Sequence, residues 1–223
     1  MSTVADALQQ RISTRAFLPT PVAEATVREL FDLARWAPSG GNLQPWNVIV
    51  VSGAAKDRVI ALSKAVPGLV PSEEGERPVY PPNLWEPYRS RRYKIGEDLY
   101  GLLGIPRENK TARLKQLARN FEFFGAPVGV FFVIDERMGH GQWAHLGMFM
   151  QSLALAAHER GLATCFQEFW GMLRQSLHTH FALGEHEMVY CGMALGYADP
   201  DAPINTLRSS REPVDAFARF LKD

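Results

Sequence analysis

The stretch Ala37-Pro38-Ser39-Gly40-Gly41-Asn42-Leu43-Gln44-Pro45-Trp46 joins the first clear amphipathic segment of this sequence to its first clear strand. Its prolines and adjacent glycines predict an irregular loop. Glycine lets a backbone approach a flat ligand closely, and the amides of Asn42 and Gln44 offer donors and acceptors to the edge of a heterocycle. The stretch therefore predicts a ligand-contacting loop.

Regular elements are expected on both sides of this loop. Residues 24–36 carry apolar side chains at helical spacing, and residues 46–51 are rich in β-branched side chains. By the same criteria we expect further helices at 4–11, 87–103, 108–124, 142–160, 173–181 and from Pro213, and further strands at 128–134, 163–169 and 188–197. Strands separated by helices indicate an α+β chain in which helices flank one mixed β-sheet.

We expect the 223 residues to form a single domain, 1–223, with one long excursion at 67–107. Prolines are dense in the first half of this excursion, between Pro67 and Pro87, and they disfavour helices and strands. Long loops in compact domains are usually functional or mobile. We therefore expect this excursion to be functional or mobile.

The composition excludes several classes of protein. The 24 Lys and Arg residues balance 24 Asp and Glu residues, so the net charge gives no support for nucleic-acid binding. Cys165 and Cys191 are too few for a disulfide framework or a four-cysteine zinc site, and we expect no metal. The sequence lacks a signal-peptide pattern, and its longest apolar stretch, 143–157, is too short to span a bilayer. We expect a cytoplasmic protein without membrane binding.

Two clusters of arginine and serine lie near the two ends of the sequence. Arg11, Ser13 and Arg15 form the first cluster, and Arg208 and Arg211 flank two serines in the second. Guanidinium groups bind phosphate through paired, charge-assisted hydrogen bonds, which hydroxyl groups supplement. The clusters predict one phosphate site if they converge, and ordinary surface ion pairs are the alternative.

Taken in order, these motifs resemble those of the FMN-dependent nitroreductase family. The resemblance covers essentially the whole chain. The matching residues are Arg11, Ser13 and Arg15; Pro38, Ser39, Asn42, Gln44, Pro45 and Trp46; Gly161, Leu162 and Cys165; Gly192, Gly196 and Tyr197; and Arg208 and Arg211. The resemblance implies a nitroreductase-like fold and an interlocked homodimer with FMN at the subunit interface. The helix at 142–160 fits a dimer, because it is apolar nearly all round and must be covered.

The resemblance also implies roles for particular residues. It assigns the FMN phosphate to Arg11, Ser13, Arg15, Arg208 and Arg211. It lets the loop reach the flavin of the partner subunit through Pro38, Ser39, Gly40, Asn42 and Gln44.

A backbone N–H near flavin N5 is implied at Glu168 or Phe169. Many relatives carry Glu-Gly there, so Phe169 indicates a more crowded pocket. Asn120 is a further candidate for the flavin ring or ribityl chain, with a helix-surface amide as the alternative reading.

The implied chemistry belongs mainly to the cofactor. NADH or NADPH delivers a hydride to flavin N5, and a nitroaromatic substrate is then reduced at the same site in a ping-pong cycle. We name no catalytic side chain. The alternatives are a quinone reductase or ene-reductase on the same scaffold, or a non-catalytic flavin-binding protein.

With such a substrate, the excursion at 67–107 is the expected source of selectivity. Aromatic side chains within it and near the suspected N5 segment are candidates for contact with a small aromatic substrate. They are Trp85, Tyr88, Phe123, Phe124 and Trp170. The cations Arg89, Arg91, Arg92 and Lys94 lie close to the first two. They attract either an NADPH phosphate or an acidic substrate, unless they only form a solvated helix face.

Overall fold

The computed structural model describes residues 3–73 and 79–222. In this part of the chain, four strands form one antiparallel sheet in the order β1-β2-β4-β3. The strands are β1 Asn47–Ser52, β2 Val128–Asp135, β3 Ala163–Gln167 and β4 Glu187–Gly196. A bulge between Phe132 and Val133 shifts the register of β2 against β4. A short parallel bridge joins Ser13 to Thr164 at the β3 edge.

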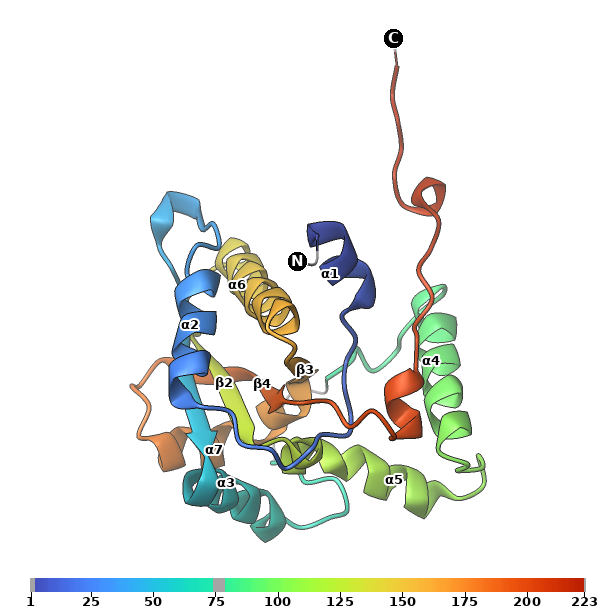
Figure 1. The fold of residues 1–223 in the computed structure, drawn as a ribbon, viewed down its shortest axis with the longest axis horizontal. Coiled ribbons are helices and arrows are strands. Elements are labelled where there is room, and N and C mark those ends of the chain that lie inside the picture. The colour runs from blue at the N-terminus through green and yellow to red at the C-terminus, as the bar shows by residue number, and fades with distance from the viewer. Residues whose placement is uncertain (1–2, 74–78, 223) are drawn as a thin grey trace.

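Helices cover both faces of the sheet, and the expected α+β class is confirmed (Figure 1). The expected mixed sheet is not found among the described strands, because every named strand pair is antiparallel and only the bridge at Ser13 is parallel. The α-helices are α1 Val4–Gln10, α2 Glu24–Ala34, α3 Gly53–Ala65, α4 Tyr88–Leu102, α5 Lys110–Ala118, α6 His140–Glu159 and α7 Arg174–Phe181. Short 3-10 segments connect them: η1 Gly40–Asn42, η2 Arg119–Gly125, η3 Glu168–Leu173, η4 Pro203–Thr206 and η5 Val214–Ala216.

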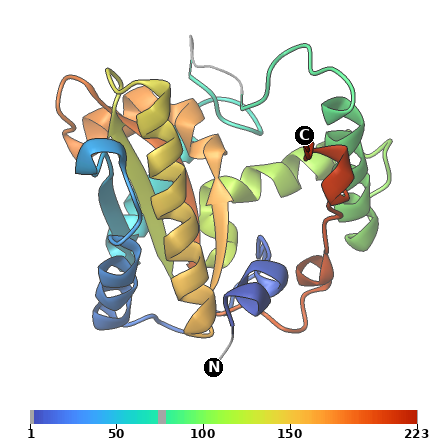
Figure 2. The ribbon, with the colours of Figure 1, turned by 90° about the horizontal axis from the view of Figure 1, so that it is seen from above.

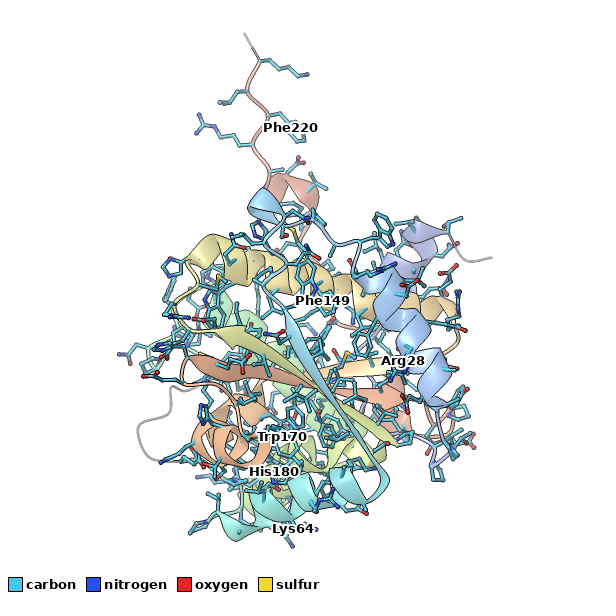
Figure 3. The ribbon with its side chains drawn as sticks, turned by 90° about the vertical axis from the view of Figure 1, so that its left-hand side faces the viewer. Arg28, Lys64, Phe149, Trp170, His180 and Phe220 are labelled. Atoms are coloured by element: carbon cyan, nitrogen blue, oxygen red, sulfur yellow. The ribbon has the colours of Figure 1, made fainter. Side chains whose placement is uncertain are left out.

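Successive residues of β2 point to opposite faces, as strand geometry requires, and each face has its own core. Phe132 packs with Leu30 of α2 and Phe149 of α6 on one face. Phe131 packs with Phe123 and Trp170 on the other face, beside α3 and α7. Figure 3 shows Phe149 and Trp170 on opposite sides of the sheet.

Helices α4 and α5 stand away from the sheet on one side of the molecule (Figure 2). An ion pair between Arg113 Nη1 and Glu97 Oε1, 2.5 Å apart, ties the two helices together. Arg91 Nε lies 3.1 Å from Glu212 Oε1, which fastens the C-terminal segment to α4. This arrangement leaves space between α4 and the end of β3, and the candidate site lies there.

Most expected elements are present, but three end differently. The helix at 108–124 stops at Ala118 and continues as η2, because Phe123 and Phe124 adopt φ angles of 51° and 52°. The strand at 163–169 ends at Gln167, where η3 begins. The helix from Pro213 is only η5, because the exposed tail beyond it has no surface of this chain to pack on.

The sequence patterns missed helix α3 altogether. Few of its side chains are buried, only Val59 and Ser63, so its apolar periodicity is weak. Lys56 Nζ donates to the Ala126 carbonyl oxygen at 2.6 Å and docks the helix. The described residues between 67 and 87 contain no helix or strand, and residues 74–78 of the excursion lie outside the described part. No helix among the described residues is long and apolar enough to cross a membrane.

Candidate active site

A cavity of about 660 Å³ lies between α4, the junction of α5 with η2, and the junction of β3 with η3. The predicted site residues Arg15, Asn120, Phe124, Glu168 and Phe169 all line it, although three separate segments supply them. The cavity therefore joins residues that the sequence analysis had assigned to cofactor and substrate.

The N-terminal and C-terminal segments meet beside β3. Thr14 N donates to the Thr164 carbonyl oxygen at 3.0 Å, so the chain after α1 runs along this strand. The Asn205 side chain accepts a hydrogen bond from Arg15 N at 2.9 Å and donates to the Ala16 carbonyl oxygen at 2.9 Å. The Asn205 side chain therefore fastens the segment that precedes the second arginine cluster to the first cluster.

Arg11 is the most informative member of these clusters. Its Nε atom is buried and has no hydrogen-bond partner in the described structure. Burial lowers the pKa of Arg11, and the nearby positive charge of Arg211 lowers it further. A buried donor without a partner is costly, and two cations facing each other add repulsion. An anion between Arg11 and Arg211 would relieve both costs.

The other arginines of the clusters also lack anionic partners. Within the described part of the chain, Arg11, Arg15, Arg208 and Arg211 form no ion pair. Arg15 Nη1 and Arg208 Nη1 donate to backbone carbonyl oxygens, and Arg211 Nη1 donates to Ser209 Oγ at 2.7 Å. These four guanidinium groups thus carry positive charge that no carboxylate of the described residues neutralises, and one of them, Arg15, lines the cavity.

The end of β3 places polar groups at the cavity. Gln167 is buried and donates from Nε2 to the Asn120 carbonyl oxygen at 2.7 Å. Glu168 follows it on the cavity wall, and burial raises the pKa of its carboxyl group. Burial also raises the pKa of the Cys165 thiol, against the charges of Arg15 and Arg11. Burial therefore disfavours the reactive thiolate form of Cys165.

The loop at 38–44 lies elsewhere in the chain, against the N-terminal half of α6. Gly40 N donates to His145 Nδ1 at 3.3 Å, and Gln44 N donates to Ser39 Oγ at 2.9 Å. Asn42 and Gln44 have backbone φ angles of 55° and 48°, which residues other than glycine rarely adopt. The loop is therefore held in a strained conformation. None of the predicted loop residues lines the cavity of its own chain.

The structure corrects part of the predicted substrate wall. Phe123 and Trp170 have no exposed surface and stack with ring centroids 5.0 Å apart, so both belong to the core and not to the cavity wall. Trp85 and Tyr88 pack edge to face at 5.5 Å, and neither lines the cavity. Of the five predicted aromatic residues, only Phe124 does.

A model of the nitroreductase family matches residues 8–197. The chain belongs to the nitroreductase family. A 4-nitrobenzoate reductase of Pseudomonas putida is 39% identical over 95% of this chain and 92% of the relative. A nitrobenzene nitroreductase of Ectopseudomonas oleovorans is 37% identical over 98% of this chain and 96% of the relative.

Solved structures agree with this family assignment. The FMN- and NADPH-dependent nitroreductase NfnB of sphigopyxis sp. strain HMH superimposes with a TM-score of 0.93 at 39% identity, covering 99% of this chain and all of that one. The FMN-dependent NfnB of Mycobacterium smegmatis, solved with NADPH, gives a TM-score of 0.85 at 30% identity and covers 97% of this chain and 96% of that one.

In this nitroreductase-family chain, two of the four cations predicted to attract a phosphate or an acidic substrate, Arg89 and Arg92, line the cavity, and Arg91 and Lys94 do not. Arg89, Arg92, Tyr93, Gly96 and Tyr100 line the cavity at helical spacings of three, four, seven and eleven residues. The spacing was visible in the sequence. It did not show that this face, and not the one carrying Arg91 and Lys94, turns toward β3.

Proposed function

We propose that this chain is an FMN-dependent NAD(P)H nitroreductase that reduces nitroaromatic compounds. The observation that carries the proposal is the buried, partnerless Nε atom of Arg11, which feels the positive charge of Arg211. The neighbouring cluster residue Arg15 lines the cavity of about 660 Å³. A phosphate group supplies what these cations lack, and the cavity has room for a flat heterocycle beside it. The residues present thus fit FMN.

The phosphate of FMN would be held by Arg11, Ser13, Arg15, Arg208 and Arg211. The flavin ring and ribityl chain would lie against Asn120, Glu168 and Phe169, which line the cavity. When bound, FMN supplies hydride transfer from NADPH or NADH to the substrate. Relatives described as NADPH-dependent favour NADPH as the donor.

The chain itself contributes binding, orientation and exclusion of water. The arginines fix the anionic end of the cofactor, while Gln167 holds the Asn120 backbone in place from within the core. Apolar side chains such as Leu99, Phe124 and Phe169 line the same cavity and limit the water around a bound ring. We assign no proton transfer to a side chain.

We also propose a homodimer in which the loop at 38–44 completes the flavin site of the partner subunit. Three surfaces support it. Helix α6 leaves a stripe of small and apolar residues exposed or half-buried, namely Ala144, Gly147, Met148, Gln151, Ser152 and Leu155. The edge strand β1 has no neighbour on one side among the described strands. The C-terminal arm projects from the body of the chain, with Phe217 and Phe220 exposed (Figure 3).

Residues 1–223 are proposed as one domain, with 67–107 as the excursion that determines selectivity. One sheet joins strands from both halves of the chain, which supports this division. A cytoplasmic location is part of the same proposal, and the two free, buried cysteines are consistent with a reducing compartment.

The test is an anaerobic titration of the purified protein. We expect a yellow protein whose flavin absorption bleaches with NADPH or NADH and returns when a nitroarene is added. A flavin that does not bleach would favour a non-catalytic flavin-binding protein. Recovery with a quinone or an activated alkene, but not with a nitroarene, would assign the alternative reductases. A protein that neither contains nor takes up FMN would overturn the proposal.

A further inference from the structure

Helix α4 forms the wall of the cavity that lies across from β3 and η3 (Figure 2). Its cavity-facing side carries Arg89, Arg92 and Tyr93, followed by Gly96. An ideal Cβ atom at Gly96 would meet no atom within 4 Å, so the wall is open at this position.

The cations at the start of α4 differ in how they are neutralised. Among the described residues, three of the four form ion pairs: Arg89 with Glu86, Arg91 with Glu212 and Lys94 with Asp98. Arg92 has no carboxylate within ion-pairing distance in the same part of the chain. It is therefore the cation of this group whose charge remains uncompensated, and it lines the cavity.

Tyr80 holds Arg92 in place. The Arg92 guanidinium carbon lies 4.1 Å from the centroid of the Tyr80 ring, which is the shortest of the cation–π contacts in the described structure. Stacking on a ring covers one face of the guanidinium and leaves its N–H donors free around the edge. Such an edge matches the two oxygens of a carboxylate through parallel hydrogen bonds.

We propose that Arg92, oriented by Tyr80, binds the carboxylate of the substrate, and that the preferred substrates are carboxylated nitroaromatics such as nitrobenzoates. This inference rests on the proposed function, whose substrate class it narrows. The aromatic ring of such a substrate finds apolar contacts with Leu99 and Phe169 in the same cavity. The relatives do not decide whether the preferred nitroarene carries a carboxylate, because one is a 4-nitrobenzoate reductase and another a nitrobenzene nitroreductase.

The experiment compares kcat/KM for 4-nitrobenzoate and nitrobenzene in the wild type, Arg92→Met, Arg92→Lys and Arg91→Met. Loss of a hydrogen bond to a charged group weakens binding by about 10-fold or more. We therefore expect Arg92→Met to lower the ratio of kcat/KM for 4-nitrobenzoate to kcat/KM for nitrobenzene by at least about 10-fold. The loss should appear mainly in the KM for 4-nitrobenzoate. Arg92→Lys should restore part of it, and Arg91→Met, whose side chain does not line the cavity, should keep the ratio within about twofold.

A binding measurement without turnover accompanies the kinetics. Benzoate carries the carboxylate but cannot be reduced, and its binding to the oxidised holoenzyme is measured by calorimetry. We expect the Kd for benzoate to rise at least about 10-fold in Arg92→Met and to change little in Arg91→Met.

The inference is overturned if the ratio and the benzoate Kd are the same in Arg92→Met and the wild type. It is also overturned if Arg92→Met raises the KM for NADPH but not for NADH and leaves the nitroarene ratio intact, because Arg92 would then bind the nucleotide phosphate. If the wild type reduces neither nitroarene, the proposed function itself fails. Reduction of nitrobenzene without dependence on Arg92 rejects only the narrower substrate class.

Discussion

The Gln167 side chain donates a hydrogen bond from Nε2 to the backbone carbonyl oxygen of Asn120, 2.7 Å away. Gln167 ends β3, and Asn120 stands in η2, 47 positions earlier in the sequence. Gln167 is almost fully buried, and its Oε1 atom has no partner in the described structure. A polar side chain is retained in the core here because it joins two walls of the cavity.

Replacing this glutamine should loosen that junction. Gln167→Leu removes the donor and leaves the Asn120 carbonyl oxygen unpaired, which costs about 1–3 kcal/mol of unfolding free energy. Urea unfolding followed by fluorescence measures the loss. Gln9→Leu, at an exposed position of α1, is the control and should stay within about 0.5 kcal/mol. Equal effects in the two variants would show that the hydrogen bond contributes nothing specific.

The double variant Arg11→Ala, Arg211→Ala should lose FMN. Each charge-assisted hydrogen bond contributes about 1.5–3 kcal/mol, so we expect the Kd for FMN to rise by at least about 100-fold. Flavin content after gel filtration measures how much FMN the variant retains, and fluorescence titration of the apoprotein gives the Kd. Arg28→Ala is the control, because Arg28 is exposed and pairs with Glu24. Normal flavin occupancy in the double variant would refute the phosphate site.

Gly129 leaves the space that the Phe123 ring fills. A Cβ atom at Gly129 would lie 2.5 Å from Cε1 and Cζ of Phe123, so Gly129→Ala should lower the unfolding free energy by about 1–3 kcal/mol. Phe123→Leu should relieve the clash, and the double variant should be more stable than the sum of the single changes predicts. Gly141→Ala in α6, where no atom lies within 4 Å, should not destabilise. Strict additivity in urea unfolding would contradict a direct contact.

Acid stability should depend on Asp135. Hydrogen bonds from Arg137 lower the pKa of Asp135 to about 2. Because the folded pKa lies below the ordinary value of about 3.9, the carboxylate stabilises the fold above pH 4, and this contribution is lost as the pH falls toward 2. Asp135→Asn should therefore show a shallower decline of Tm over this range. Asp201→Asn, whose side chain forms no ion pair among the described residues, should retain the wild-type slope.

A charge on the exposed stripe of α6 should disrupt the proposed dimer. Gly147 is exposed within the stripe, so Gly147→Arg should shift sedimentation toward the monomer. FMN retention should fall at the same time, because the partner's loop is proposed to complete the flavin site. Ala25→Arg, on an exposed position of α2, provides the same charge elsewhere and should leave the dimer intact. A Gly147→Arg protein that stays dimeric would move the interface to another surface.

Local patterns in the sequence were sufficient for most of the fold. The β-branched run at 46–51 and the apolar run at 128–134 form strands because burying such residues on a sheet is favourable in many environments. The arginine clusters at Arg11 and Arg211 were equally visible, because two arginines with serines between or beside them within five residues are evident from the letters alone. Helix α3 was missed since its stability comes from docking and not from its own periodicity.

The walls of the cavity depend on distances between elements, and no local pattern contains them. Phe123 and Phe124 are neighbours with the same side chain, but one fills the space above Gly129 and the other lines the cavity. Arg91 and Arg92 are also neighbours, but Arg91 pairs with Glu212 while Arg92 faces the cavity beside Tyr80. Which member of each pair lines the cavity was settled by the packing of α4 and η2 against β3, because burial and charge pairing are properties of the assembled fold.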